Sequence, residues 1–147
     1  MLELRKEGRV FRLFTEDDIN QIAPHFKAYN FPEGAVVTKP GEQIDMMGII
    51  VSGEVVVEEE TELKGNWIVL ARLSRGALYI NPTLFGGEPT PVRVIAQRDI
   101  AFLGINKLSF DALLDQHPHI GIKFMKEIIR VIQSRLRGLT ARFVGVF

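Results

Sequence analysis

The stretch from Gly76 to Ala96 reads GALYINPTLFGGEPTPVRVIA, and it is built differently from the short strand patterns on either side of it. Gly76 can open a tight turn, and Pro82 suits the first turn of a short helical segment. Two glycines and two closely spaced prolines follow, and the β-branched residues near the end of the stretch predict a strand. A loop, a short helix and a strand in this order can form a ligand-binding cradle, so this stretch is our first candidate site.

Short segments with a period of two surround this stretch. They predict strands at residues 35–39, 46–52, 54–60, 67–73, 91–97 and 100–105, separated by turns that contain glycine or proline. We therefore predict a fold that is mainly β with flanking helices, an antiparallel β-roll or jelly roll. The acidic run at residues 58–62 falls at a hairpin tip, where it is either a solvated loop or a docking patch.

Helical patterns occupy both ends of the chain. In the first segment Thr15 is the predicted N-cap of a helix, and Pro24 is expected to bend or end that helix. Two further helices are predicted at residues 106–115 and 120–139, with a break at His117-Pro118-His119. The chain is thus expected to form a single domain, residues 1–147, with a helical segment at 1–29, a β-roll at 30–105 and C-terminal helices and tail at 106–147.

Composition restricts the classes of function. The chain of 147 residues has 18 basic and 18 acidic side chains, whereas nucleic-acid binders usually carry a basic surplus. The absence of cysteine excludes disulfides, thiol nucleophiles and cysteine-ligated metals. The charged N-terminus does not match a signal peptide, and no apolar run reaches the ~18 residues of a membrane span. We therefore expect a cytoplasmic domain without a membrane span.

The order of the turn and strand motifs resembles the cyclic nucleotide-binding domain family, which includes the jelly-roll sensor domain of catabolite activator protein. The resemblance rests on Phe31-Pro32-Glu33-Gly34, Pro40-Gly41-Glu42, the strand turn Met47–Val55, Leu73-x-x-Gly76, Val94-x-Ala96 and Phe110–Pro118. Each motif is common in β proteins, but their order and spacing together are specific. The resemblance implies that residues 76–96 are the phosphate-binding cassette of this family.

The cassette departs from the family pattern at the positions that hold cyclic nucleotide. The resemblance places Tyr79 at the aromatic position, but Ile80 stands for the glycine, Asn81 for the glutamate and Thr90 for the arginine. A buried charge without its partner costs ~2–5 kcal/mol. We therefore predict that cAMP does not bind in the usual way. The candidate ligand-binding residues are Gly76, Tyr79, Ile80, Asn81, Pro82, Thr83, Thr90, Pro91, Val92 and Arg93.

Arg93 is the only basic residue of the cassette, and two interpretations of it remain open. It lies three residues beyond Thr90, so in a straight strand the two side chains face opposite sides and Arg93 is a surface residue. A bulge at residues 89–91 would reverse this parity and make Arg93 a relocated anion ligand.

The predicted last helix has a broad apolar stripe. The candidate dimer-interface residues on it are Met125, Ile128, Ile129, Ile132 and Leu136. The helix is expected either to form a homodimer with a parallel copy of itself or to pack in a groove of its own chain. The sequence stops soon after Arg142, without the ~60–70 residues of a winged helix-turn-helix, so we expect no DNA-binding domain and no direct sequence-specific contact with nucleic acid.

No residue pattern indicates catalysis or a metal site. His117 and His119 lack further ligands at suitable spacing, so the pair is interpreted as a helix break. No serine has the context of a nucleophile elbow. We predict a non-enzyme without a cofactor, a regulatory or interaction module whose partner is another protein or a second copy. The alternative is a small-molecule receptor that binds a cyclic nucleotide or another anionic metabolite through a non-standard cassette.

Overall fold

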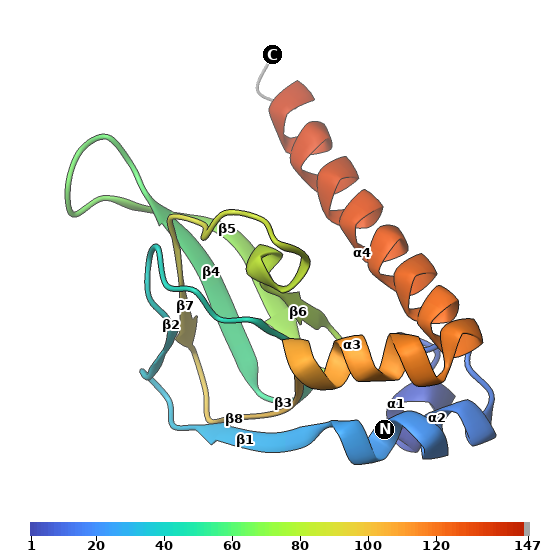
Figure 1. Cartoon of the computed structure of the whole chain (residues 1–147). Helices are drawn as coiled ribbons and strands as arrows, with labels where there is room; N and C mark the ends of the chain where they lie inside the picture. Colours follow the sequence, from blue (N-terminus) through green and yellow to red (C-terminus); the bar gives the residue numbers. More distant parts are fainter. Residues whose placement is uncertain (146–147) are drawn as a thin grey trace.

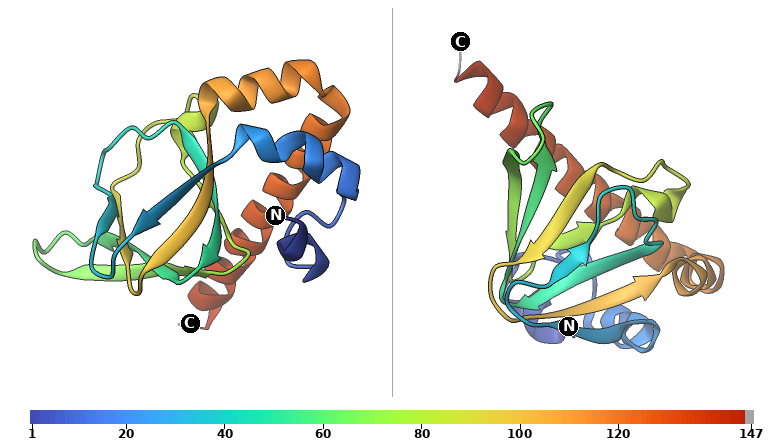
Figure 2. Two further views of the ribbon diagram at one scale, coloured as in Figure 1. Left: turned by 90° about the horizontal axis from the view of Figure 1, so that it is seen from below. Right: turned by 90° about the vertical axis from the view of Figure 1, so that its left-hand side faces the viewer.

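Eight short strands form two four-stranded sheets that face each other (Figure 1 and Figure 2). The computed structural model describes residues 1–145. One sheet has the strand order β1-β8-β3-β6 and the other β2-β7-β4-β5, with antiparallel pairing throughout. The strands are β1 (Lys27–Phe31), β2 (Val36–Thr38), β3 (Met46–Ser52), β4 (Glu54–Glu60), β5 (Trp67–Ser74), β6 (Leu78–Ile80), β7 (Val92–Ala96) and β8 (Ile100–Asn106). The predicted antiparallel β-roll is confirmed.

The sheet that contains β3 separates two apolar cores. Because successive side chains of a strand point to opposite faces, neighbouring residues of β3 belong to different cores. Ile50 packs with buried residues of both sheets, whereas Ile49 packs with buried residues of the helices. The core between the sheets consists of Ile50, Val55, Leu73, Val94, Ala96, Ile100 and Phe102. The alternating pattern of the sequence therefore sets which side chains face the second sheet and which face the helices.

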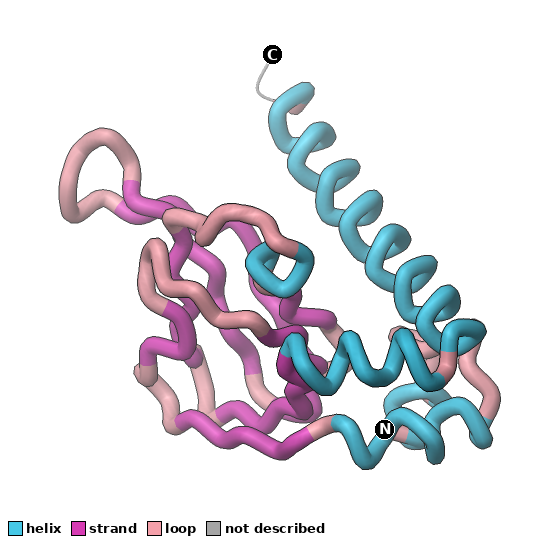
Figure 3. Tube along the Cα trace, viewed as in Figure 1, coloured by secondary structure: helices cyan, strands magenta, loops and turns pink. Residues whose placement is uncertain are grey.

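The helices meet at one end of the molecule (Figure 3), and phenylalanine rings cluster between them. The helices are α1 (Leu2–Lys6), α2 (Glu16–Ile22), the 3-10 helix η1 (Ala23–His25), α3 (Lys107–Gln116) and α4 (Pro118–Val144). Phe124 of α4 lies at the centre of the cluster. Its ring centroid is 5.0 Å from that of Phe14, 5.9 Å from those of Phe11 and Phe110, and 6.2 Å from that of Phe26. This cluster fixes the first half of α4 against the N-terminal segment.

Hydrogen bonds at the start of α2 also tie it to α4. The Thr15 hydroxyl accepts from the Asp18 amide at 3.1 Å, and the Asp18 carboxylate accepts from the Thr15 amide at 2.9 Å, which confirms the predicted N-cap. Lys123 Nζ donates to the same carboxylate at 2.5 Å. Asp18 thus joins a helix cap to an ion pair between α2 and α4.

The predicted boundaries are wrong in two places. The segment expected to be helical up to residue 29 already contains β1, because η1 ends the helical region at His25 and Tyr29 stacks on Phe102 with ring centroids 5.0 Å apart. The last helix begins at Pro118, two residues earlier than expected, since proline suits the first helical turn. It also continues to Val144. No helix among residues 1–145 is long and apolar enough to cross a bilayer.

Candidate functional site

The cassette begins as a strand. β6 pairs with β3, with Ile80 opposite Met47 and Tyr79 opposite Gly48. Within residues 1–145, Phe11 is the only non-glycine residue with a positive φ, so Ile80 does not adopt the left-handed conformation that glycine would allow. Ile80, which is β-branched, is thus part of an extended strand. A cradle of backbone N–H groups at a glycine is not formed here.

A 3-10 helix, η2 (Pro82–Phe85), follows β6, as the position of Pro82 predicted. Asn81 is its N-cap and is only 2% exposed. The Asn81 Oδ1 accepts from the Thr83 amide at 3.1 Å, and the Thr83 hydroxyl lies 2.8 Å from the same oxygen. The side-chain oxygen of Asn81 is therefore engaged in holding η2.

A cavity of about 200 Å³ lies between this segment and the sheet of β4, β5 and β7. Such a volume is below the ~300–1,000 Å³ of typical small-molecule pockets. The residues that line it are mostly apolar: Val57, Ala71, Leu73, Tyr79, Ile80, Asn81, Pro82, Thr90, Val92, Val94 and Arg135. We call this the cassette cavity.

The hydroxyl of Tyr79 is one of the few polar groups at the cassette cavity. It lies 2.5 Å from the hydroxyl of Thr38 on β2. Burial raises the pKa of Tyr79, and hydrogen bonds from Thr38 and Asn81 offset part of that shift. Tyr79 is therefore a neutral hydrogen-bonding group at physiological pH.

Arg135 is the only charged residue that lines the cassette cavity, and it comes from α4. Its guanidinium donates to the carbonyl oxygen of Leu78 on β6. Burial lowers the pKa of Arg135 from its ordinary value, and no carboxylate within residues 1–145 forms an ion pair with it. A half-buried arginine without a counter-ion is suited to an anionic or hydrogen-bond-accepting ligand.

Arg93 lies on the opposite side of β7 from the cassette cavity. Its Nη2 is 2.8 Å from Glu58 Oε2, and its guanidinium carbon lies 3.6 Å from the centroid of the Trp67 ring. The neighbours Val92 and Val94 point into the cavity instead. The interpretation of Arg93 as a relocated anion ligand is therefore wrong, because β7 keeps the straight alternation of a strand here.

The proposed dimer-interface residues on α4 divide into two groups. Ile128 is 4% exposed and belongs to the core of its own chain, and Met125 packs against that core. Ile129, Ile132 and Leu136 are 51–62% exposed. The exposed residues belong to a row with alternating spacings of three and four residues, which we call the α4 seam: Ile122, Met125, Ile129, Ile132, Leu136 and Leu139. Figure 1 shows that the second half of α4 extends beyond the other helices.

The histidines do not form a metal site with other residues. The rings of His117 and His119 lie 6.4 Å apart at the junction of α3 and α4. Among residues 1–145 there is no group of three or more histidine, aspartate or glutamate side chains that could hold a metal ion. The helix break at His117 is present as predicted, with Pro118 as the first residue of α4.

The family model of the cyclic nucleotide-binding domain matches residues 29–117. The chain belongs to this family. It is 28% identical over 121 residues to a cyclic nucleotide-gated potassium channel of Mesorhizobium japonicum, an alignment that covers 82% of this chain and 30% of the channel. The chain thus spans less than a third of the length of that curated relative.

Solved structures show the same fold at low sequence identity. A cyclic nucleotide-binding domain from Methylobacillus flagellatus superposes with a TM-score of 0.84 at 20% identity, covering 91% of this chain and 75% of that one. Thermus thermophilus catabolite activator protein gives 0.76 at 18%, covering 93% and 63%. The guanosine-bound regulatory subunit of a cAMP-independent protein kinase A from Trypanosoma cruzi gives 0.62 at 18%, covering 77% and 39%.

The structure brings six of the ten cassette candidates of this cyclic nucleotide-binding domain together around one cavity. These six are Tyr79, Ile80, Asn81, Pro82, Thr90 and Val92. The other four, Gly76, Thr83, Pro91 and Arg93, do not line it. Sequence reasoning missed Arg135 as a residue of this site. No local motif marks it, because its role depends on the angle at which α4 passes the cassette.

Proposed function

We propose that this cyclic nucleotide-binding domain is a non-catalytic regulatory module that acts by pairing its α4 with α4 of a second copy. The observation that carries the proposal is the α4 seam. Five of its six residues are 48–62% exposed, and they extend over 18 residues of one helix face. Isolated exposed apolar residues are normal, but a continuous row at heptad spacing indicates a helix partner.

The charges that flank the seam favour a second copy in parallel orientation. With Ile129 and Leu136 at the first seam position of each heptad, Arg135 and Arg142 occupy one flanking row and Gln133 and Thr140 the other. In a parallel pair the two different rows meet, so each arginine faces a neutral side chain. In an antiparallel pair like rows meet, and arginines would face arginines. The parallel homodimer avoids this repulsion.

Light scattering on Ile132→Glu tests the pairing. The substitution places a carboxylate in the seam of both chains, and we expect the dimer to weaken more than ~100-fold, since two buried isoleucine side chains are lost. Ala141→Glu is the matched control, because it adds the same charge to the opposite side of α4. Dimeric wild type, dimeric Ala141→Glu and monomeric Ile132→Glu are the expected results. A wild type that is monomeric at high micromolar concentration contradicts the proposal.

The cassette gives this module little means of holding cyclic phosphate in the family's usual way. Thr90 lines the cavity where the family pattern has arginine, and Asn81 Oδ1 is bonded to Thr83. No cationic side chain of the cassette itself reaches the cavity, because Arg93 is paired with Glu58. At ~2–5 kcal/mol for an unpaired buried charge, binding would weaken roughly thirty- to several-thousand-fold.

A second candidate function rests on Arg135. We propose, as the alternative, a receptor whose ligand accepts hydrogen bonds from this arginine inside the cassette cavity: a cyclic nucleotide bound by a non-standard route or another anionic metabolite. The Trypanosoma cruzi regulatory subunit of the same fold belongs to a cAMP-independent protein kinase A and is bound to guanosine, so at least one protein of this fold holds a nucleoside without a cyclic phosphate. Arg135 could meet the acceptor atoms of a base as well as those of an anion.

Calorimetry with cAMP, cGMP and guanosine separates the two candidates. If the domain is a receptor, one of these ligands binds the wild type, and Arg135→Gln weakens that binding by about tenfold or more. Arg93→Gln is the matched control, because it removes an arginine that faces away from the cavity. Thr90→Arg should raise affinity for cAMP if only the missing charge prevents binding. Absence of binding of all three ligands to the wild type contradicts a receptor for cyclic nucleotides or guanosine.

A further inference from the structure

A second hollow lies on the other side of Arg135 from the cassette cavity. Its volume is about 180 Å³, and three arginines from two separate parts of the chain line it: Arg9, Arg130 and Arg135. Residues 76–78, Val131 and Ser134 complete the wall. We call this hollow the arginine notch. No acidic side chain lines it.

Packing at its base holds the arginine notch in place. Gly76 has a positive φ of 85°, and a Cβ at this position would lie 3.1 Å from the Cβ of Arg9, so the N-terminal segment rests directly on the start of the cassette. Arg130 Nη2 donates to the carbonyl oxygen of Arg9 at 3.3 Å, which joins α4 to the same segment. The notch is therefore formed where the N-terminal segment, the cassette and α4 meet.

Two of the three guanidinium groups have no carboxylate partner within residues 1–145. Arg9 donates no hydrogen bond there, and Arg135 donates only to the carbonyl oxygen of Leu78. Arg130 is paired with the buried Glu127, with 2.6 Å between Nη2 and Oε1. Nε and Nη2 of Arg130 donate to Glu127 and to the carbonyl oxygen of Arg9. The two N–H groups of Nη1 are not used in these hydrogen bonds and can donate to a ligand. The hydrogen bond from Arg75 is the main cause that lowers the pKa of Glu7, and the nearby charge of Arg9 makes a smaller contribution in the same direction.

We propose that the arginine notch binds the dianion of a phosphate monoester, carried by a small phosphorylated molecule. Two guanidinium groups that form no ion pair within residues 1–145 match a charge of about −1.5 to −2, which a phosphate monoester carries at pH 7. A cyclic phosphate is a diester with a single charge and matches them less well. The forked donors of arginine suit phosphate oxygens, and the Ser134 hydroxyl adds a further donor. The formal net charge of zero does not favour a nucleic acid as the partner.

This site is separate from the cassette cavity and depends neither on α4 pairing nor on the receptor function. Arg135 lines both the arginine notch and the cassette cavity. The variants that test the notch are therefore placed at Arg9 and Ser134, which line the notch and not the cassette cavity.

Titration calorimetry with inorganic phosphate and with phenyl phosphate, at constant ionic strength in chloride, is the test. We expect both probes to bind the full chain, and Arg9→Gln to weaken binding about tenfold or more. Ser134→Glu places a carboxylate in the notch and should abolish binding. Arg137→Gln is the matched control, because Arg137 is an exposed arginine of α4 that does not line the notch. Arg9 and Ser134 are exposed, so thermal melts without phosphate should be unchanged in both variants.

The pH dependence gives a second readout. The arginines keep their charge at all relevant pH values, whereas a phosphate monoester loses its second charge below pH ~6. Affinity for phenyl phosphate should therefore fall as the pH is lowered from 7.5 to 5.5. Equal losses in Arg9→Gln and Arg137→Gln, or no phosphate binding by the wild type, overturn the proposal. Either result leaves the light-scattering and cAMP experiments unaffected, so a failure of this site is distinguishable from a failure of the proposed function.

Discussion

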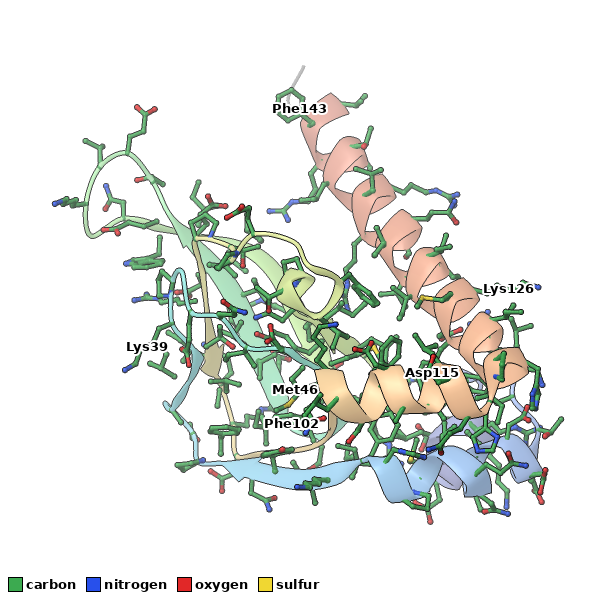
Figure 4. All side chains as sticks on the ribbon, in the orientation of Figure 1. Lys39, Met46, Phe102, Asp115, Lys126 and Phe143 are labelled. Atoms are coloured by element: carbon green, nitrogen blue, oxygen red, sulfur yellow. The ribbon has the colours of Figure 1, made fainter. Side chains whose placement is uncertain are left out.

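The two halves of α4 differ in what holds them. In the first half, Ile120, Phe124 and Ile128 are at most 4% exposed and face the phenylalanine cluster and the sheet of β3. In the second half, the apolar residues Ile132, Leu136 and Leu139 are 48–62% exposed. Lys126 marks the outer side of the first half and projects away from the sheets (Figure 4). The first half thus has a buried apolar stripe beside its part of the α4 seam, whereas these apolar residues of the second half are covered by nothing else within residues 1–145.

This difference teaches that hydrophobic spacing alone does not tell a core stripe from an interface stripe. Both halves of α4 have apolar residues at three- and four-residue intervals, yet only the first half meets other helices. The second half contacts the β-roll mainly through arginines, with Arg135 donating to Leu78 and Arg142 donating to Val69 and Leu70. The stability of the fold should therefore depend on the first half more than on the second.

The largest expected effect is the loss of the ring at the centre of the phenylalanine cluster. Phe124→Ala should lower the free energy of unfolding by about 3–5 kcal/mol, the usual cost of removing a buried aromatic side chain. Leu139→Ala, in the second half of α4, should change it by less than ~0.5 kcal/mol. Urea denaturation of both variants in the Ile132→Glu background keeps self-association out of the comparison. Similar losses in the two variants would remove the distinction between the halves.

An intermediate effect is expected at the ion pair that anchors the first half. Burial alone would raise the pKa of Asp18, but hydrogen bonds from Lys123 and Thr15 outweigh it and hold the pKa below its ordinary value of 3.8. A lowered pKa means that the carboxylate stabilises the fold above pH 3.8 and that this stabilisation is lost as the pH falls through the lower, folded-state pKa. Asp18→Asn should therefore cost about 1.5–3 kcal/mol at pH 7.

The comparison between pH 7 and pH 3 separates this charge from general acid sensitivity. Asp17→Asn is the matched control, since Asp17 is an exposed carboxylate of the same helix, bonded to Gln21 at 2.7 Å. Wild type and Asp17→Asn should both lose stability on acidification. Asp18→Asn should lose less stability on acidification, because this variant already lacks the stabilising charge of Asp18 at pH 7. An acid dependence of Asp18→Asn equal to that of the wild type would show that the ion pair contributes little.

The fold was predictable because its signals are local. The turn at Gly53 shows why: its φ is +87°, and a Cβ there would lie 2.3 Å from the carbonyl oxygen of Asp99, so only glycine fits between β3 and β4. Thr15 and Pro82 likewise act within a few residues of their own positions. β1 was missed because the residues of its partner, β8, lie 69–77 positions further along the sequence. Its pairing with β8 outweighs any local helical preference.

The candidate site was predictable only in part, for the same physical reason. The departures at Ile80 and Thr90 are visible in the sequence because the cassette is one continuous segment. Arg135 of α4 donates to Leu78 of that segment across 57 residues of sequence, and Arg9 reaches the segment from more than 60 residues before it. Such convergence depends on how α4 and the N-terminal segment pack on the β-roll. Spacing within the sequence does not contain that information.

The smallest expected effect concerns the arginine that attaches the end of α4 to the β-roll. β5 is the edge strand of its sheet, and its register with β4 shifts next to Leu70. The carbonyl oxygens of Leu70 and Val69 accept from Arg142 at 3.2 and 3.3 Å. Arg142→Gln removes these two bonds, so it should cost only about 0.5–1.5 kcal/mol in the free energy of unfolding.

Amide hydrogen exchange locates that small effect better than denaturation does. If the arginines are the main attachment of the second half of α4, Arg142→Gln should speed exchange in residues 136–144 and leave residues 120–131 unchanged. Arg137→Gln is the control, because Arg137 is exposed on the same helix. Faster exchange along the whole helix would mean that α4 responds as one unit. In that case the phenylalanine cluster and the arginine contacts stabilise a single element, and the two halves differ in exposure but not in what holds them.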